Sequence, residues 1–258
     1  MTLKDKINGM TKDILKSIIT NNLGIVVELD NKIICYVDSQ KLKAKDGFCE
    51  IFCSGVNDEE REILETYGLN KPIQYIISDS NFLQPRVCII ANKSADVLIR
   101  NCNFDSFESI LGDGNCIIEN SNIKSQGNLY IVANNIVIKG TTIQKAENQE
   151  VASIAAKYTL DIIDSNIDTF NDQLSISATS SATSGLNVTN SKLIGSKVEM
   201  LSNNVVVDDD SQVVVKDNVH ILSHIPVTLN INGKKVYKEA LISPFSTSED
   251  SYGGKRGK

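Results

Sequence analysis

A four-residue phrase recurs along the middle of the chain and constrains its fold more than any other feature. Each copy has Asp, Asn or Gly first, a small residue second, a polar residue third and a large apolar residue fourth. The clear copies are Asp79–Phe82, Asn101–Phe104, Asn120–Ile123, Gly140–Ile143, Asp164–Ile167 and Asn190–Leu193, and a weaker copy is Asp210–Val213. The copies start at 79, 101, 120, 140, 164, 190 and 210, so they lie 22, 19, 20, 24, 26 and 20 residues apart. Self-similarity at this period is typical of a solenoid.

Each period also contains short runs in which apolar residues alternate with other residues. One run precedes the phrase, as in Val97–Ile99 and Ile136–Ile138, and a second follows it, as in Leu129–Val132. Alternation with a period of two indicates β-strands and not helices. If each period is one turn of a coil, every strand lies parallel to its counterpart in the next turn, about 4.8 Å away.

Comparing the copies position by position supports this stacking. The fourth position is large and apolar in every clear copy, as a row of inward-facing side chains requires. The second position is small throughout, as a tight interior corner requires: Ser80, Cys102, Ser121, Thr141, Ser165 and Ser191. The first position holds Asp, Asn or Gly, which tolerate turn or left-handed backbone. We therefore expect a buried apolar row, a corner of small residues and a bend at the first position.

This repeat resembles that of the right-handed parallel β-helix (pectate-lyase-like) superfamily, in which a strand is followed by Asn or Asp, a small residue, a polar residue and an aliphatic one. The resemblance covers roughly residues 73–225. It implies an all-β fold, a right-handed parallel β-helix solenoid of about seven turns. It does not indicate one function, because this fold hosts lyases, hydrolases, phage tailspikes, adhesins and non-enzymatic scaffolds.

The segments outside the repeat are expected to cover the ends of the coil, where strand edges would otherwise be unpaired. We predict an N-terminal cap over residues 1–72, the β-helix over 73–225, a C-terminal hairpin cap over 226–242 and a flexible tail over 243–258. The cap should contain an amphipathic helix over 3–20 and a second helix that begins after Asn57 and stops at Gly68. Turn pairs predict hairpins around residues 30–31, 46–47 and 232–233. The hairpins before residue 54 can equally be irregular first turns of the coil.

Composition narrows the classes of partner. The net charge of −6 argues against nucleic acid, whose phosphates require clustered Lys and Arg. No apolar run approaches the length of a membrane span, and the first residues lack the apolar stretch of a signal peptide. The six cysteines fall mostly at apolar strand positions and are interpreted as reduced, small hydrophobic residues. We therefore expect a cytoplasmic protein, or one of a virion assembled in the cytosol.

Paired carboxylates are the first requirement of a β-helix that cleaves glycans. Lyases of the resembled family gather acidic residues from neighbouring turns around calcium and use Arg or Lys as the base. The weak catalytic candidates here are Asp161, Asp208, Asp209 and Asp210, and the run of three acids is also a candidate for weak calcium binding. No other cofactor is indicated. The absence of Trp and the low aromatic content, 5%, disfavour a carbohydrate groove.

Two pairs of possible metal ligands and two long turns also bear on function. His220 and His224 are interpreted as unpaired surface histidines, because no Cys or acidic residue accompanies them at ligand spacing. Cys49 and Cys53 share one strand face, but no second pair completes a zinc site. The long turns at 144–150 and 178–184 are interpreted as insertions that the solenoid tolerates. The alternative is that they form a binding lip.

The sequence favours a non-enzymatic scaffold that binds a protein partner or self-associates. The candidate partner-binding residues are the helix face Leu3, Ile7, Met10, Ile14 and Ile18, and the outward row Arg100, Glu119 and Lys139 on successive turns. One alternative is a polysaccharide lyase or hydrolase, or a glycan-binding β-helix. A second alternative is a viral or bacterial effector that blocks a host protein.

Overall fold

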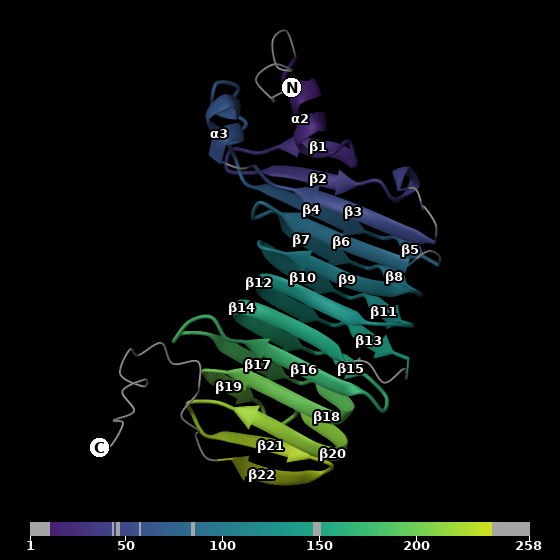
Figure 1. Cartoon of the computed structure of the whole chain (residues 1–258), viewed down its shortest axis with the longest axis vertical. Coiled ribbons are helices and arrows are strands. Elements are labelled where there is room, and N and C mark those ends of the chain that lie inside the picture. Colours follow the sequence, from purple (N-terminus) through teal and green to yellow (C-terminus); the bar gives the residue numbers. More distant parts are fainter. Residues whose placement is uncertain are drawn as a thin grey trace, which may run out of the picture.

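The computed structural model describes residues 11–42, 44, 47–56, 58–83, 86–146 and 151–238, and it is a β-solenoid of about seven turns (Figure 1). The predicted all-β solenoid is confirmed. Strands of successive turns pair in parallel, as the stacked columns of the sequence require. No helix in these ranges is long and apolar enough to cross a membrane.

The coil has three walls, which we name A, B and C. The A wall contains β2 (Ile33–Val37), β4 (Ile73–Ser78), β7 (Asp96–Arg100), β10 (Asn115–Glu119), the second halves of β12 (Leu129–Lys139) and β14 (Ala152–Ile163), β17 (Gly185–Thr189) and β19 (Asn204–Val207). The B wall contains β5 (Asn81–Phe82), β8 (Asn103–Phe104), β11 (Asn122–Ser125), β13 (Thr142–Lys145), β15 (Asn166–Asp168) and the first parts of β18 (Lys192–Ser202) and β20 (Gln212–Leu222). The C wall contains β3 (Phe48–Ser54), β6 (Arg86–Asn92), β9 (Phe107–Gly112), the first halves of β12 and β14, β16 (Gln173–Ala178) and the second parts of β18 and β20.

The predicted stack of buried apolar side chains is present along the B wall. The strand register places Phe82, Phe104, Ile123, Ile143, Ile167, Leu193 and Val213 directly over one another. All of them are buried, and the rings of Phe82 and Phe104 stack in parallel with their centroids 4.6 Å apart. A large side chain buried in this way contributes roughly 1.5–3 kcal/mol. Each member of this row therefore helps to stabilise the stack.

The small residues of the phrase form a buried hydroxyl ladder at the corner between the A and B walls. The hydroxyls of Ser121, Thr141, Ser165, Ser191 and Ser211 each accept a hydrogen bond from the backbone N–H at the same corner position of the preceding coil, at 3.0–3.3 Å. The hydroxyls of all but Ser211 also donate to the carbonyl two residues earlier, as Ser165 does to Ile163 at 2.6 Å, whereas Ser211 donates to the carboxylate of Asp208. These residues are small because the corner is tight, and hydroxylated because the bend leaves an N–H group for them to bind.

The first position of the phrase has the backbone that its composition predicts. Its φ angle is positive in all six clear copies: Asp79, Asn101, Asn120, Gly140, Asp164 and Asn190. The left-handed conformation is least costly for Gly, Asn and Asp. Two pairs of these side chains also bind one another between coils, since Asn101 donates to Asp79 at 2.9 Å and Asn190 donates to Asp164 at 2.7 Å. The bend is thus specified twice, by backbone preference and by side-chain contacts.

The N-terminal end combines short helices with the first strands of the coil. Helices α2 (Lys12–Ile19) and α3 (Asp58–Glu65) and the short 3-10 helix η1 (Ser39–Lys41) are present, and Gly68 has the positive φ expected after α3. Strand β1 (Gly24–Glu28) forms the predicted hairpin with β2. The hairpin predicted around residues 46–47 stays a prediction, because residues 43, 45 and 46 of its first strand and turn lie outside the described residues; β3 itself lies parallel to β6 along its whole length. Residues 1–10, 43, 45, 46 and 57 are outside the described residues.

The C-terminal end carries the predicted hairpin. Strands β21 (Val227–Ile231) and β22 (Lys234–Lys238) pair in antiparallel fashion, and both turn residues, Asn232 and Gly233, have positive φ. This turn chemistry is the one favoured for tight hairpins. Among the described residues, β22 pairs with β21 alone. Three of the five residues of β22 are lysines.

Replacing Ser165 by Ala should destabilise the fold by about 1–3 kcal/mol, because the buried N–H of Thr141 loses its acceptor. Urea unfolding followed by circular dichroism measures the change. Ser153→Ala, on the outer face of the C wall, is the matched control and should have little effect. Equal effects of the two substitutions would contradict the role given to the ladder.

Glu28 is the centre of an ionic cluster at the N-terminal end. Its carboxylate lies 2.8 Å from Lys12, 2.9 Å from Lys71 and 3.1 Å from Lys16. Hydrogen bonds from Lys12 and Lys71 are the main reason that the pKa of Glu28 falls from 4.5 to about 2. The cluster ties α2 and the segment before β4 to the edge strand β1.

The lowered pKa gives a signed pH dependence. Because the folded state favours the carboxylate, its contribution is fully present above about pH 4.5 and is lost as the pH falls through about 2. The stability difference between the wild type and Glu28→Gln should therefore shrink across this window. Urea titrations at a series of pH values measure it, with Glu50→Gln on β3 as control. A difference that is constant down to about pH 2 would exclude the cluster as a source of stability.

Candidate partner-binding surface

The four acidic candidates do not form one site. Asp161 lies on the outer face of the A wall, where it accepts a hydrogen bond from Asn187 at 2.6 Å. Asp208 closes a turn by accepting from the backbone N–H groups of Asn190 and Ser211, both at 2.9 Å. Desolvation raises the pKa of Asp208, but the hydrogen bonds from Ser211 and Asn190 together lower it below its ordinary value. Asp209 forms an exposed ion pair with Lys235, at 2.7 Å, at the C-terminal hairpin.

No metal site is assembled in the part of the chain that the structure describes, where no three His, Cys, Asp or Glu side chains gather. Cys49 and Cys53 are buried, and desolvation raises the pKa values of both thiols. His220 lies 3.7 Å from Glu199, and the backbone N–H of His224 binds Asn203, so the two histidines have separate surroundings. All six cysteines are free thiols, consistent with their interpretation as small hydrophobic residues.

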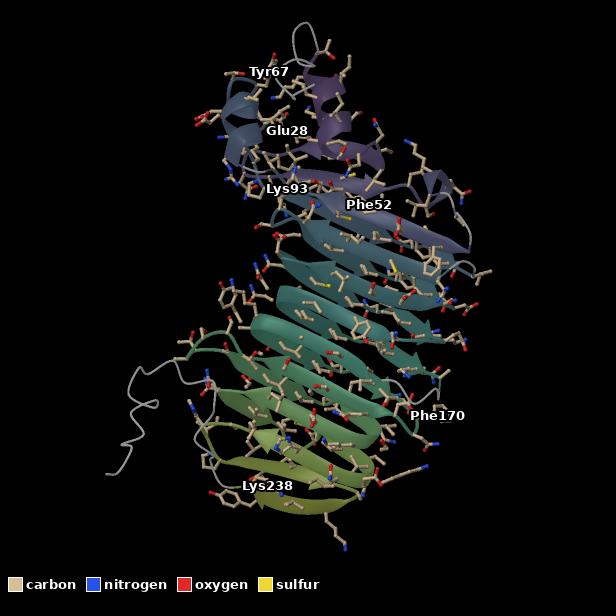
Figure 2. The ribbon with its side chains drawn as sticks, in the orientation of Figure 1. Glu28, Phe52, Tyr67, Lys93, Phe170 and Lys238 are labelled. Carbon is tan, nitrogen blue, oxygen red and sulfur yellow. The ribbon has the colours of Figure 1, made fainter. Side chains whose placement is uncertain are left out.

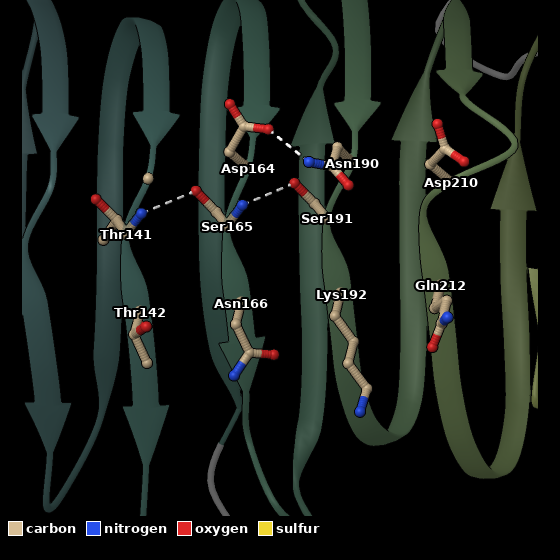
Figure 3. A pocket seen from close by; sticks show the side chains of 11 residues that line it. Thr141, Thr142, Asp164, Ser165, Asn166, Asn190, Ser191, Lys192, Asp210 and Gln212 are labelled. Carbon is tan, nitrogen blue, oxygen red and sulfur yellow. Dashed lines mark hydrogen bonds between the residues drawn. The ribbon is translucent and has the colours of Figure 1, made fainter.

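A shallow polar groove runs along the A–B corner over four coils (Figure 3). Asp210 lines it together with Asp164, Asn190 and Lys192, and its volume is about 380 Å³. Asp164 is hydrogen-bonded to Asn190, as a corner residue should be. The groove can offer carboxylates, amides and one ammonium group to a polar ligand.

The two long turns do not lie together. The turn at 144–150 connects β13 to β14 at the B–C corner, and residues 147–150 are outside the described residues. The turn at 178–184 connects β16 to β17 at the C–A corner, where Ser180 binds the carbonyl of Lys157 and Ser184 is fully buried. A single binding lip made of both turns is therefore wrong.

The candidate partner-binding residues are partly located. Leu3, Ile7 and Met10 are outside the described residues, Ile14 is 48% exposed and Ile18 is half-buried, whereas the neighbouring Leu15 is completely buried. The register confirms that Arg100, Glu119 and Lys139 form one outward column of the A wall. Arg100 and Lys139 are exposed, and Glu119 is partly so.

A buried ion pair lies inside the coil and was not predicted. Lys145 and Asp172 are both buried, with Nζ and Oδ2 2.5 Å apart. Lys145 stands inward beside Ser125 of the preceding coil, and its ammonium group also donates to the carbonyl of Ala146. No sequence pattern indicated this pair, because Lys145 is the last residue of β13, next to a long turn, and its partner is 27 residues away.

Lys145→Met should destabilise the fold by about 3–5 kcal/mol, because it leaves the Asp172 carboxylate buried without its counter-ion. The double variant Lys145→Met/Asp172→Val removes both charges and should recover most of that loss. Urea unfolding of the three proteins measures the coupling. A double variant no more stable than the single one would contradict the ion pair.

An apolar column lies on the outer face of the C wall. Phe52, Ile90, Leu111 and Val132 lie on β3, β6, β9 and β12, and the register places each beside the next. Phe52 and Leu111 are each 46% exposed and Val132 is 37% exposed. We name these four residues the apolar row; Figure 2 labels Phe52 near its N-terminal end.

A column of mixed character, with one charged residue and two hydroxyl groups, borders the apolar row on its own wall. Glu50, Cys88, Ser109 and Tyr130 form the adjacent column, two residues earlier on each strand. Arg86 lies beyond them, 3.9 Å from Glu108 and over the ring of Phe48. The wall thus presents an apolar strip with a polar border. A sequence signal existed, since adjacent apolar pairs such as Ile89-Ile90 and Ile131-Val132 put one member of each pair outside.

The fold and this surface define a parallel β-solenoid with an exposed apolar strip on one wall. Comparisons with protein-family models, with curated proteins and with solved structures found no match. The likeness to the pectate-lyase-like superfamily therefore remains a prediction from the repeat.

Proposed function

We propose that this chain is a non-enzymatic scaffold that binds a protein partner on the C wall. The observation that carries the proposal is the apolar row, where apolar side chains of four successive coils are aligned on the outer face, three of them exposed and Ile90 half-buried. Contiguous exposed apolar surface with a polar border is typical of a protein-binding site.

The construction of the coil supports a scaffold role. Ile89, Ile110 and Ile131 are fully or almost fully buried directly behind the apolar row, on the same three strands. Because the inner face of these strands is packed, the backbone that carries the apolar row is held in place. A surface that is already rigid loses less entropy when a partner binds.

Affinity capture with the full chain from cells of its source tests the proposal. The wild type should retain a protein that Leu111→Asn loses, because the substitution places an amide at the centre of the apolar row. Val206→Asn is the matched control, since Val206 is 49% exposed on the A wall. Thermal melts of all three proteins verify folding. Capture that is insensitive to Leu111→Asn would overturn the choice of surface.

A glycan-binding role is the second candidate, and the polar groove of the A–B corner favours it. Asp164, Asn190, Lys192 and Asp210 offer both donors and acceptors, which hydroxyl-rich ligands require. Calorimetric titration with acidic and neutral oligosaccharides, with and without calcium, tests it. Heat that disappears in Lys192→Ala and persists in Leu111→Asn would favour this role over protein binding.

A further inference from the structure

We propose that the apolar row binds the apolar row of a second copy of this chain, in an antiparallel, two-fold symmetric dimer. The inference rests on the proposed function, because it uses the same surface and names its partner. It differs from association through the N-terminal helix or through the ends of the coil. The reason is that the C wall is complementary to itself.

The symmetry follows from the order of the strands. The apolar row has one residue on each of β3, β6, β9 and β12, which are consecutive neighbours (Figure 1). A two-fold axis that runs parallel to the strands, between β6 and β9, places β3 opposite β12 of the second copy and β6 opposite β9. Under this axis, each column of residues on the C wall faces the same column of the second copy. Such an interface is isologous and closed.

This axis matches the apolar side chains by size. Phe52 lies opposite Val132 of the second copy, so the largest residue of the row meets the smallest. Ile90 lies opposite Leu111, which are similar in volume. Two sheets packed face to face interdigitate in this way at about 10 Å separation.

The same axis matches the polar border. Glu50 lies opposite Tyr130 of the second copy, so a phenol hydroxyl can donate to a carboxylate. Arg86 lies on β6, and Glu108 lies on β9, one residue before Ser109. The axis therefore brings Arg86 toward Glu108 of the second copy on both sides of the interface. Opposite charges that meet across an interface fix its register.

The expected dimer is weak. The four residues of the apolar row span about 14 Å along the coil, at about 4.8 Å per strand. An interface of that length lies at the small end of specific interfaces, where association is transient. We therefore expect a monomer–dimer equilibrium that depends on concentration.

Sedimentation velocity of the full chain between about 1 and 300 μM tests the inference, since this range brackets micromolar dissociation constants. The wild type should move from monomer toward dimer as concentration rises, and Leu111→Asp should remain a monomer. Val206→Asp, with its exposed side chain on the A wall, should dimerise as the wild type does. Circular dichroism melts establish that each variant is folded.

A charge exchange distinguishes this two-fold axis from other modes of association. Arg86→Glu and Glu108→Arg should each weaken self-association, because like charges then meet across the interface. An equimolar mixture of the two variants should form a heterodimer, because both opposed pairs are again of opposite sign. Association through the ends of the coil or through the N-terminal helix, where these two residues do not face the second copy, does not predict this recovery.

Two results would overturn the inference: a wild type that is monomeric throughout the series, or a dimer insensitive to Leu111→Asp. Dimers whose mixed charge variants fail to recover would overturn the proposed axis. If the wild type is monomeric and Leu111→Asn still loses a captured protein, the partner is a different protein and the scaffold role stands. If neither experiment responds, both proposals fail.

Discussion

Hydrogen bonding from one coil to the next at the A–B corner is the interaction on which the rest of the structure depends. The hydroxyl of each corner residue binds the N–H group of the preceding coil and, in most coils, a carbonyl of its own coil. The position of each bend is thereby fixed against its neighbour. A slip of one residue would turn every side chain to the opposite face. The corner hydrogen bonds therefore keep the stacked apolar side chains of the B wall buried. The outer columns of the other walls inherit the same alignment.

Most of the fold could be predicted, because the repeat presents the same local sequence pattern in several copies. Phe82, Phe104 and Ile123 occupy one column of the sequence and one buried row of the structure. The positive φ angles at Asp79 and Asn101 follow equally from residue type. Agreement between copies averages out the ambiguity of any single short strand. The parallel pairing of β3 with β6 was not predicted, because the sequence around β3 has no clear copy of the phrase.

The candidate surface was harder to predict, because the outer faces do not follow the repeat. Inward-facing positions need a similar residue type in every coil, because they must pack against one another. Outward-facing positions need only be compatible with solvent, so their residues can differ from coil to coil and can contact a partner. Leu111 and Val132 were hidden in runs that suggested ordinary strands. The Lys145–Asp172 pair could not be found either, because it joins the end of β13 to the residue before β16, in different coils. The acidic candidates illustrate the converse: Asp208, Asp209 and Asp210 are adjacent in sequence, yet they contact three different surroundings.

The lysines of β22 have a consequence for how such molecules assemble. A stack of parallel coils could in principle grow without limit, each chain adding its first strand to the last strand of another, as in a fibril. Lys234, Lys235 and Lys238 would have to be crowded against each incoming backbone, so addition at this end is opposed by desolvation and repulsion. The composition of β22 therefore disfavours growth of the stack beyond this strand, and it is compatible with the sideways, two-fold contact proposed for the C wall.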